Sequence, residues 1–203
     1  MALAQPAEAK IVYTKTHRVI KVGSDLLGLD LNHDGVIDFT FYLLQSSNGS
    51  GLAVFGCTFS ETRTCVTNGI WTSKRVSSAA ALPPGFVIGR RGGRSHKARM
   101  LGGGLISGSR KTTWGNWLNV KNRYLGLKFV IKGKTHFGWA RLSASWPPVQ
   151  ATLTGYAYET IPNKPIIAGK KNGPDVITLE PASLGHLAQG ASAIPTWRKA
   201  GGN

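Results

Sequence analysis

The clearest pattern in the chain is a strict alternation of apolar and polar residues in its second half. Apolar residues occupy every second position from Leu125 to Ile131, which places their side chains on one face of an extended strand. The next two residues, Lys132 and Gly133, are typical of a two-residue turn. Residues 135–142 then resume a strand pattern. The segment therefore predicts an antiparallel β-hairpin.

Short apolar segments of the same kind recur along the rest of the chain, separated by turn residues. Further strands are expected at residues 11–22, 37–43, 52–57, 65–71, 151–158 and 166–168. No segment of the body has the periodicity of an amphipathic helix of ten or more residues. About eight short strands with turns between them predict an all-β protein, an antiparallel β-sandwich of the jelly-roll or lectin-like kind with long loops.

Composition divides the chain into three parts. Residues 1–9 are expected to be a disordered start or the remnant of an export signal, and residues 10–169 to form the sandwich. Residues 170–203 are rich in Gly, Pro, Ala and Ser, so we expect a poorly ordered tail. Within the body, residues 89–111 are basic and Gly-rich without apolar periodicity, which predicts a long surface loop. No run of about 18 apolar residues occurs, which excludes a membrane-spanning helix from the sequence.

Three carboxylates lie within nine positions of a chain that has only 9 Asp and Glu residues. Oxygen ligands fall at the first, third, fifth, seventh and ninth positions of this segment: Asp30, Asn32, Asp34, the carbonyl of Val36, and Asp38. Oxygen ligands at this spacing suit a hard divalent cation, with a glycine at the sixth position where the chain turns sharply. Gly35 is that glycine, so the segment predicts a Ca²⁺ loop.

The loop resembles the strand-borne calcium loops of integrin-like repeat proteins. Its twelfth position is Phe41, where a helical calcium hand has a bidentate Glu. Because a strand pattern follows the loop, we expect a strand–loop–strand site in which the cation stiffens a hairpin. The alternative is an Asp-Gly turn that carries solvated carboxylates.

The chain is strongly basic, since 25 Lys and Arg residues against 9 Asp and Glu give a formal net charge of +16. Such a surface attracts polyanions. The candidate ligand-binding residues are the cations of the expected basic loop and the two tryptophans that follow it: Arg90, Arg91, Arg94, Lys97, Arg99, Arg110, Lys111, Trp114 and Trp117. Cations of this kind pair with phosphate, sulfate or carboxylate oxygens, and exposed indoles offer stacking faces to sugars. The alternative is a solvated flexible loop.

Two features bear on the compartment. Cys57 and Cys65 flank a polar segment suited to a hairpin tip, and a disulfide there would fit an exported protein. Two unpaired thiols are the alternative. Residues 2–4, Ala-Leu-Ala, resemble the small-residue end of a secretory signal whose apolar core is missing. An unstructured start of a cytosolic protein is the alternative at this end.

Three segments carry a resemblance to known proteins: Asn-Arg-Tyr-Leu-Gly-Leu-Lys-Phe at 122–129, Gly-Lys-Thr-His-Phe-Gly-Trp-Ala-Arg-Leu at 133–142, and Leu-Thr-Gly-Tyr-Ala-Tyr-Glu at 153–159. They are similar to a group of uncharacterised exported bacterial proteins that often end in a PEP-CTERM type sorting tail. Residues 180–185 and 197–199 look like a degenerate copy of that tail, in which Leu179 replaces the first Pro. The resemblance implies an exported, β-rich protein and supplies no reaction or ligand.

Together these features favour a secreted or surface-attached bacterial protein, stabilised by calcium, that binds an anionic polysaccharide or another surface polyanion and is not an enzyme. Nucleic acid is not an expected partner in vivo. A structural subunit of a surface layer or appendage, with self-association, is the alternative. A glycan-cleaving enzyme ranks third, because Glu61 and Glu159 are the only glutamates in the expected fold and nothing pairs them.

Overall fold

The computed structural model describes residues 10–21, 26–56, 68–73, 78–90, 94–95, 99–107, 110–146 and 149–172, with the backbone alone at 94–95, 99–100 and 102–107. The chain divides into two units, Met1–Gly173 and Pro174–Asn203, and only the first contains described residues. The expected start at 1–9, most of the expected tail, and the Cys57–Cys65 pair lie outside the described residues.

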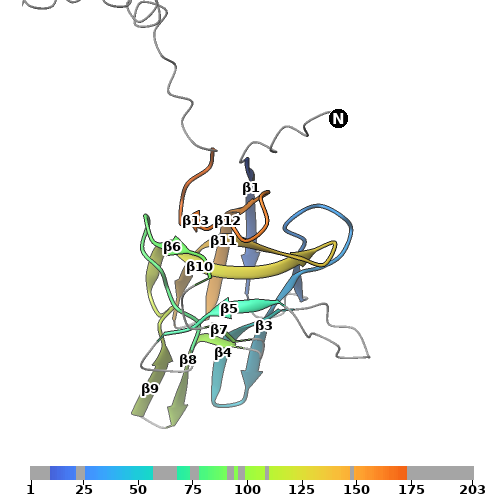
Figure 1. The fold of residues 1–203 in the computed structure, drawn as a ribbon. Helices are drawn as coiled ribbons and strands as arrows, with labels where there is room; N and C mark the ends of the chain where they lie inside the picture. Colours follow the sequence, from blue (N-terminus) through green and yellow to red (C-terminus); the bar gives the residue numbers. More distant parts are fainter. Residues whose placement is uncertain are drawn as a thin grey trace, which may run out of the picture. The chain divides into compact units, whose positions relative to one another are not determined.

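The protein is all-β and its strands pair antiparallel, as the sequence predicts (Figure 1). One sheet has the order β1-β12-β11-β10-β5-β7. Its strands are β1 (Ile11–Ile20), β5 (Gly69–Trp71), β7 (Arg94–Ser95), β10 (Val120–Ile131), β11 (Lys134–Ser145) and β12 (Gln150–Glu159). The second sheet, of order β2-β3-β4-β8-β9, contains β2 (Leu27–Leu29), β3 (Phe39–Ser46), β4 (Gly49–Phe55), β8 (Arg99–Ser107) and β9 (Arg110–Gly115). The described residues contain no helix, and therefore none that could cross a membrane.

The hairpin of β10 and β11 confirms the prediction made from the alternating segment. Lys132 and Gly133 connect the two strands with φ values of 47° and 76°. Positive φ at both central residues is the geometry of a type I′ turn, whose twist matches that of the paired strands. The pairing continues from Ile131 with Lys134 to Leu125 with Ala140 and beyond, so local alternation and turn chemistry agree along this element.

The main core lies between the two sheets. The six-stranded sheet contributes buried residues such as Leu125, Leu127 and Leu153, and the five-stranded sheet contributes Phe39 and Phe41. These side chains occupy alternate positions of their strands, which is why they share a face. Apolar faces of two sheets packed on each other define a β-sandwich.

A second apolar cluster covers the opposite face of the six-stranded sheet. Trp139 is fully buried there, and its ring meets that of Tyr124 edge to face with centroids 5.2 Å apart. Ile88 of β6 (Val87–Ile88) and Ile166 of β13 (Ile166–Ile167) close this cluster, and the two strands pair as a separate two-stranded sheet. The expected short strand near residue 166 is confirmed. That this sheet is buried on both faces was not predicted.

The prediction of a long surface loop at residues 89–111 is wrong for most of its length. Residues 99–107 form β8, which pairs with β4 on one side and β9 on the other, and residues 94–95 form β7. The failure has a physical cause: β8 contains Gly102, Gly103 and Gly104, and residues without side chains cannot show apolar periodicity. Hydrogen bonding to two neighbouring strands makes this segment a strand.

Candidate metal loop and basic surface

The acidic segment connects two paired strands. Leu27–Leu29 of β2 pair with Phe39–Phe41 of β3, and the amide of Asp38 donates to the carbonyl of Leu29 at 2.9 Å. Residues 30–38 therefore form the closed end of a hairpin. The strand–loop–strand arrangement expected from Phe41 at the twelfth position is what the structure has.

Asp30 organises the turn of this loop. Its Oδ1 accepts from the amide of His33 at 2.7 Å, and its Oδ2 accepts from the amide of Gly35 at 2.9 Å. These two donors sit at the fourth and sixth loop positions. His33 and Gly35 have φ values of 61° and 88°, the left-handed region that favours glycine. The first carboxylate thus bends the backbone around the loop interior.

Asn32 and Asp34 lie together at the third and fifth positions. The side-chain amide of Asn32 donates to Asp34 Oδ2 at 2.8 Å, and the backbone amide of Val36 donates to Asp34 Oδ1 at 2.9 Å. The bond from Asn32, followed by that from Val36, lowers the pKa of Asp34. The Asn32 Oδ1 is buried and has no hydrogen-bond partner. A buried oxygen left without a donor is costly, and a bound cation would satisfy it.

Asp38 is the buried carboxylate of the loop, with 7% of its surface exposed. Burial, with the charges of Asp30 and Asp34 as smaller contributions, raises the pKa of Asp38 to about 7 although the Leu31 amide donates to its Oδ2 at 2.8 Å. The charges of Asp30 and Asp34 therefore oppose the ionisation of Asp38. A divalent cation among them would remove that repulsion.

The loop is anchored to the six-stranded sheet by residues that the sequence did not single out. Leu31 is fully buried, and a Cβ built on Gly138 of β11 would lie 2.7 Å from its Cδ2. The ring of His33 stacks on Tyr156 of β12, with its Nε2 3.1 Å from the tyrosine hydroxyl. His33 and Tyr156 are 123 positions apart, so no local pattern could have paired them.

The carboxylates are not gathered around one point. Within the residues that the structure describes, no group of three or more His, Cys, Asp or Glu side chains is assembled closely enough to hold a metal. Asp30, Asp34 and Asp38 are instead engaged with backbone amides or with Asn32. Asp34 is exposed, but both of its carboxylate oxygens accept hydrogen bonds, from Asn32 and from Val36. Binding a cation in this loop would require the side chains to rearrange.

The basic candidates do not form one cluster. Arg91 and Lys97 lie outside the described residues, Arg94 falls in β7 of the six-stranded sheet, and Arg99 begins β8 of the other sheet. Arg90 is exposed at the end of the segment before β7.

Arg110 and Lys111 are exposed on β9, an edge strand, where Trp114 is half-buried. The described part of the expected site is therefore concentrated on β9.

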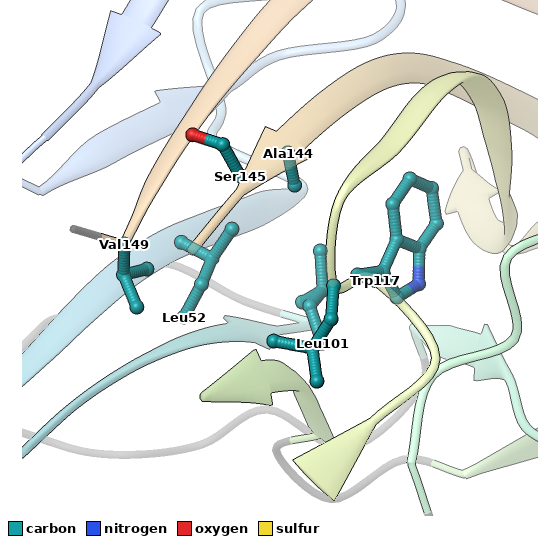
Figure 2. Close-up of a pocket in the computed structure, with 7 residues that line it drawn as sticks. Leu52, Leu101, Trp117, Ala144, Ser145 and Val149 are labelled. Atoms are coloured by element: carbon teal, nitrogen blue, oxygen red, sulfur yellow. The ribbon is translucent and has the colours of Figure 1, made fainter. Parts of the chain in front are cut away.

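Trp117 is a core residue, and its expected exposure is wrong. Its side chain is 2% exposed, and Figure 2 shows its indole beside Leu101, with Leu52, Ala144 and Val149 lining the same small hollow. Leu52 and Leu101 belong to one sheet and Ala144 to the other, so the indole packs into the core between the sheets. The irregular sequence around Trp117 hid this role, because burial here comes from tertiary packing and not from strand periodicity.

The fold and the loop define the class as an all-β sandwich protein with an acidic strand–loop–strand element. No protein-family model matches the chain, and no curated protein or solved structure is significantly similar to it. A functional assignment therefore depends on the chemistry of the described residues.

Proposed function

We propose that this chain is a secreted or surface-attached bacterial protein, stabilised by calcium, that binds an anionic polysaccharide without catalysing a reaction. The observation that carries the calcium part is the loop itself: a sharply turned backbone, a buried Asn32 oxygen without a donor, and a buried Asp38 among like charges. Bacterial export is supported by the resemblance of residues 122–142 and 153–159 to exported proteins.

Calcium would act as a structural cation in this protein. The candidate ligands are oxygens of Asp30, Asn32, Asp34, Val36 and Asp38. Their shared position between β2 and β3, next to the Leu31 and His33 contacts with the six-stranded sheet, means that a bound ion ties the hairpin to the sandwich. An ion that binds only the folded state raises the free energy of unfolding.

Thermal unfolding and calorimetric titration of chelator-treated protein test the calcium proposal. We expect calcium to raise the melting temperature at millimolar concentration, with a smaller effect of magnesium because its six-coordinate shell is stricter. Asp30→Asn should abolish the response. Asp25→Asn is the matched control, because it removes the same charge outside the ligand spacing. If wild-type protein gives no heat of calcium binding and no change in melting temperature with calcium, the calcium proposal is refuted.

The polyanion part is supported by the distribution of charge. Within the described residues, carboxylate side chains occur only in the loop at residues 30–38 and at Glu159. Elsewhere in this part of the chain, the charged side chains are Lys and Arg. Glu159 is 2% exposed, accepts from the Ile161 amide at 3.1 Å and lies 3.6 Å from Lys164 Nζ. A buried, engaged carboxylate is poorly placed to meet a polymer, which favours binding over glycan cleavage.

The structural-subunit alternative has less support from the sheet edges. β1 is a ten-residue edge strand, the kind of element that could pair with another copy. It contains Lys15, His17 and Arg18, and its pairing with β12 is irregular between Lys15 and Arg18. Charged side chains and bulges are devices that oppose edge-to-edge pairing. Sizing at high concentration tests this, because polymers would favour the subunit.

A further inference from the structure

A hollow of about 220 Å³ lies on the outer face of the five-stranded sheet, and we call it the Trp114 groove. Leu44 of β3 and Trp114 of β9 form its walls, and Gly51 of β4 lies in its floor. Gln45, Ser46, Gly49 and Ser50 complete the lining. The groove lies on the strand that carries the exposed Arg110 and Lys111.

The strand register explains why the groove exists. Leu44 pairs with Gly51, Gly51 with Gly103, and Gly103 with Trp114, so one row crosses four strands. Residues directly opposite on paired strands share a face. The row therefore has a large side chain at each end and none between. Three strand spacings of about 4.8 Å separate its ends by about 14 Å.

This row faces away from the main core. Leu43 and Leu52, the neighbours of Leu44 and Gly51 along their strands, pack into the core between the sheets. Successive residues of a strand point to opposite faces, so Leu44 and Trp114 point outward. Leu44 is 41% exposed, and the indole of Trp114 is partly accessible. A glycine inside a strand often marks a place where a ligand or another backbone approaches closely.

A cation further along the same face of β9 favours an anionic occupant of the groove. Arg110 lies four residues before Trp114 on β9, on the same face and about 14 Å along the strand, with Thr112 between them. Arg110 and Thr112 are exposed. No described carboxylate lies on β3, β4, β8 or β9. A guanidinium binds carboxylates in a bidentate manner, whereas an apolar peptide would leave it unused.

We propose that the Trp114 groove binds a segment of an acidic polysaccharide rich in uronic acids. One sugar ring stacks on the indole of Trp114, and a carboxylate of the same polymer pairs with Arg110. This assignment rests on the proposed function, because it names the site and the ligand class for the polyanion binding inferred above.

Calorimetric titration of the full chain with short galacturonate oligomers, in the presence of calcium, tests the assignment. Neutral maltose oligomers serve as the comparison ligand. Trp114→Ala should weaken binding about tenfold, the size of a lost stacking contact. Gly51→Val should also weaken it, because the new side chain fills the floor while suiting a strand. Arg110→Gln should weaken it and reduce its salt dependence.

Lys121→Gln is the matched charge control, since Lys121 is exposed on β10 of the other sheet. Melting temperatures measured on every variant separate lost binding from lost folding. Wild-type protein that binds no acidic oligomer refutes the polyanion part of the proposed function and the groove with it. Binding that survives Trp114→Ala and Gly51→Val refutes the groove and leaves the proposed function standing. Equal binding of neutral oligomers overturns the anionic assignment.

Discussion

Replacing Asp38 by Asn separates the cost of a buried charge from its use as a calcium ligand. The side chain keeps its size. In the wild type the Leu31 amide donates to Asp38 Oδ2 at 2.8 Å, and the oxygen of an asparagine can accept the same hydrogen bond. What disappears is the ionisable group. Asp30 and Asp34, the carboxylates that face Asp38 from the same loop, are unchanged. The substitution therefore tests one charge in an otherwise intact hairpin.

The magnitude follows from the raised pKa of Asp38. Its ordinary value is 3.8 and its value in the fold is about 7, so the folded protein holds this proton more tightly than the unfolded chain. The contribution of Asp38 to the free energy of unfolding then falls as the pH rises from about 4 to about 7 and levels off above it. A shift of this size corresponds to about 4 kcal/mol at pH 8. Without calcium, Asp38→Asn should be more stable than wild type at pH 8, by up to that amount, and equal to it near pH 4.

Calcium reverses the comparison. At about 100 times its dissociation constant, a ligand adds about 2.7 kcal/mol to the free energy of unfolding. Wild type should gain this stabilisation and Asp38→Asn should gain much less, because an amide oxygen is a weaker ligand than a carboxylate. Urea unfolding of wild type and Asp38→Asn at about pH 4 and pH 8, each in chelator and in calcium, measures these differences in the free energy of unfolding.

Asp34→Asn is the control, because its carboxylate is exposed and its pKa is lowered by Asn32 and Val36 rather than raised. It should not stabilise the protein in chelator at pH 8. If Asp38→Asn is less stable than wild type under those conditions, the assigned cost of the buried charge is wrong. If calcium stabilises Asp38→Asn as much as wild type, Asp38 is not a ligand.

Three further predictions concern packing. Leu31→Ala should lower the free energy of unfolding by about 2–5 kcal/mol, because it opens a cavity, and urea unfolding measures this loss. It should also weaken calcium binding. An unchanged calcium affinity would mean that the loop keeps its shape without the Leu31 contact. Trp117→Ala should lower the free energy of unfolding by about 3–5 kcal/mol and leave the oligosaccharide affinity of the folded protein unchanged. This is the reverse of the result expected for Trp114→Ala. A loss of affinity without a loss of stability would contradict the core role of Trp117. Gly138→Ala should lower the melting temperature, because its new Cβ would lie 2.7 Å from the carbonyl oxygen of Ala157; an unchanged melting temperature would show that the strands separate at no cost.

Local sequence information was sufficient for the elements whose chemistry is local. The alternation before Ile131 and the Lys132–Gly133 pair predicted the β10–β11 hairpin, because a strand's faces and a turn's φ values depend on neighbouring residues alone. The ligand spacing from Asp30 to Asp38 likewise predicted a turned acidic loop between strands. Its affinity for calcium stays a prediction.

The tertiary structure decided the features that depend on distant partners. β8 is a strand because β4 and β9 hydrogen-bond to it, although its glycines show no pattern. Trp114 and Trp117 are three positions apart in similar sequence, yet one borders an outer groove and the other closes the core. The row from Leu44 to Trp114 spans 70 positions of the chain, and only strand register brings its ends to one face. Periodicity states which residues share a face of a strand, whereas the order and register of the strands determine what that face meets.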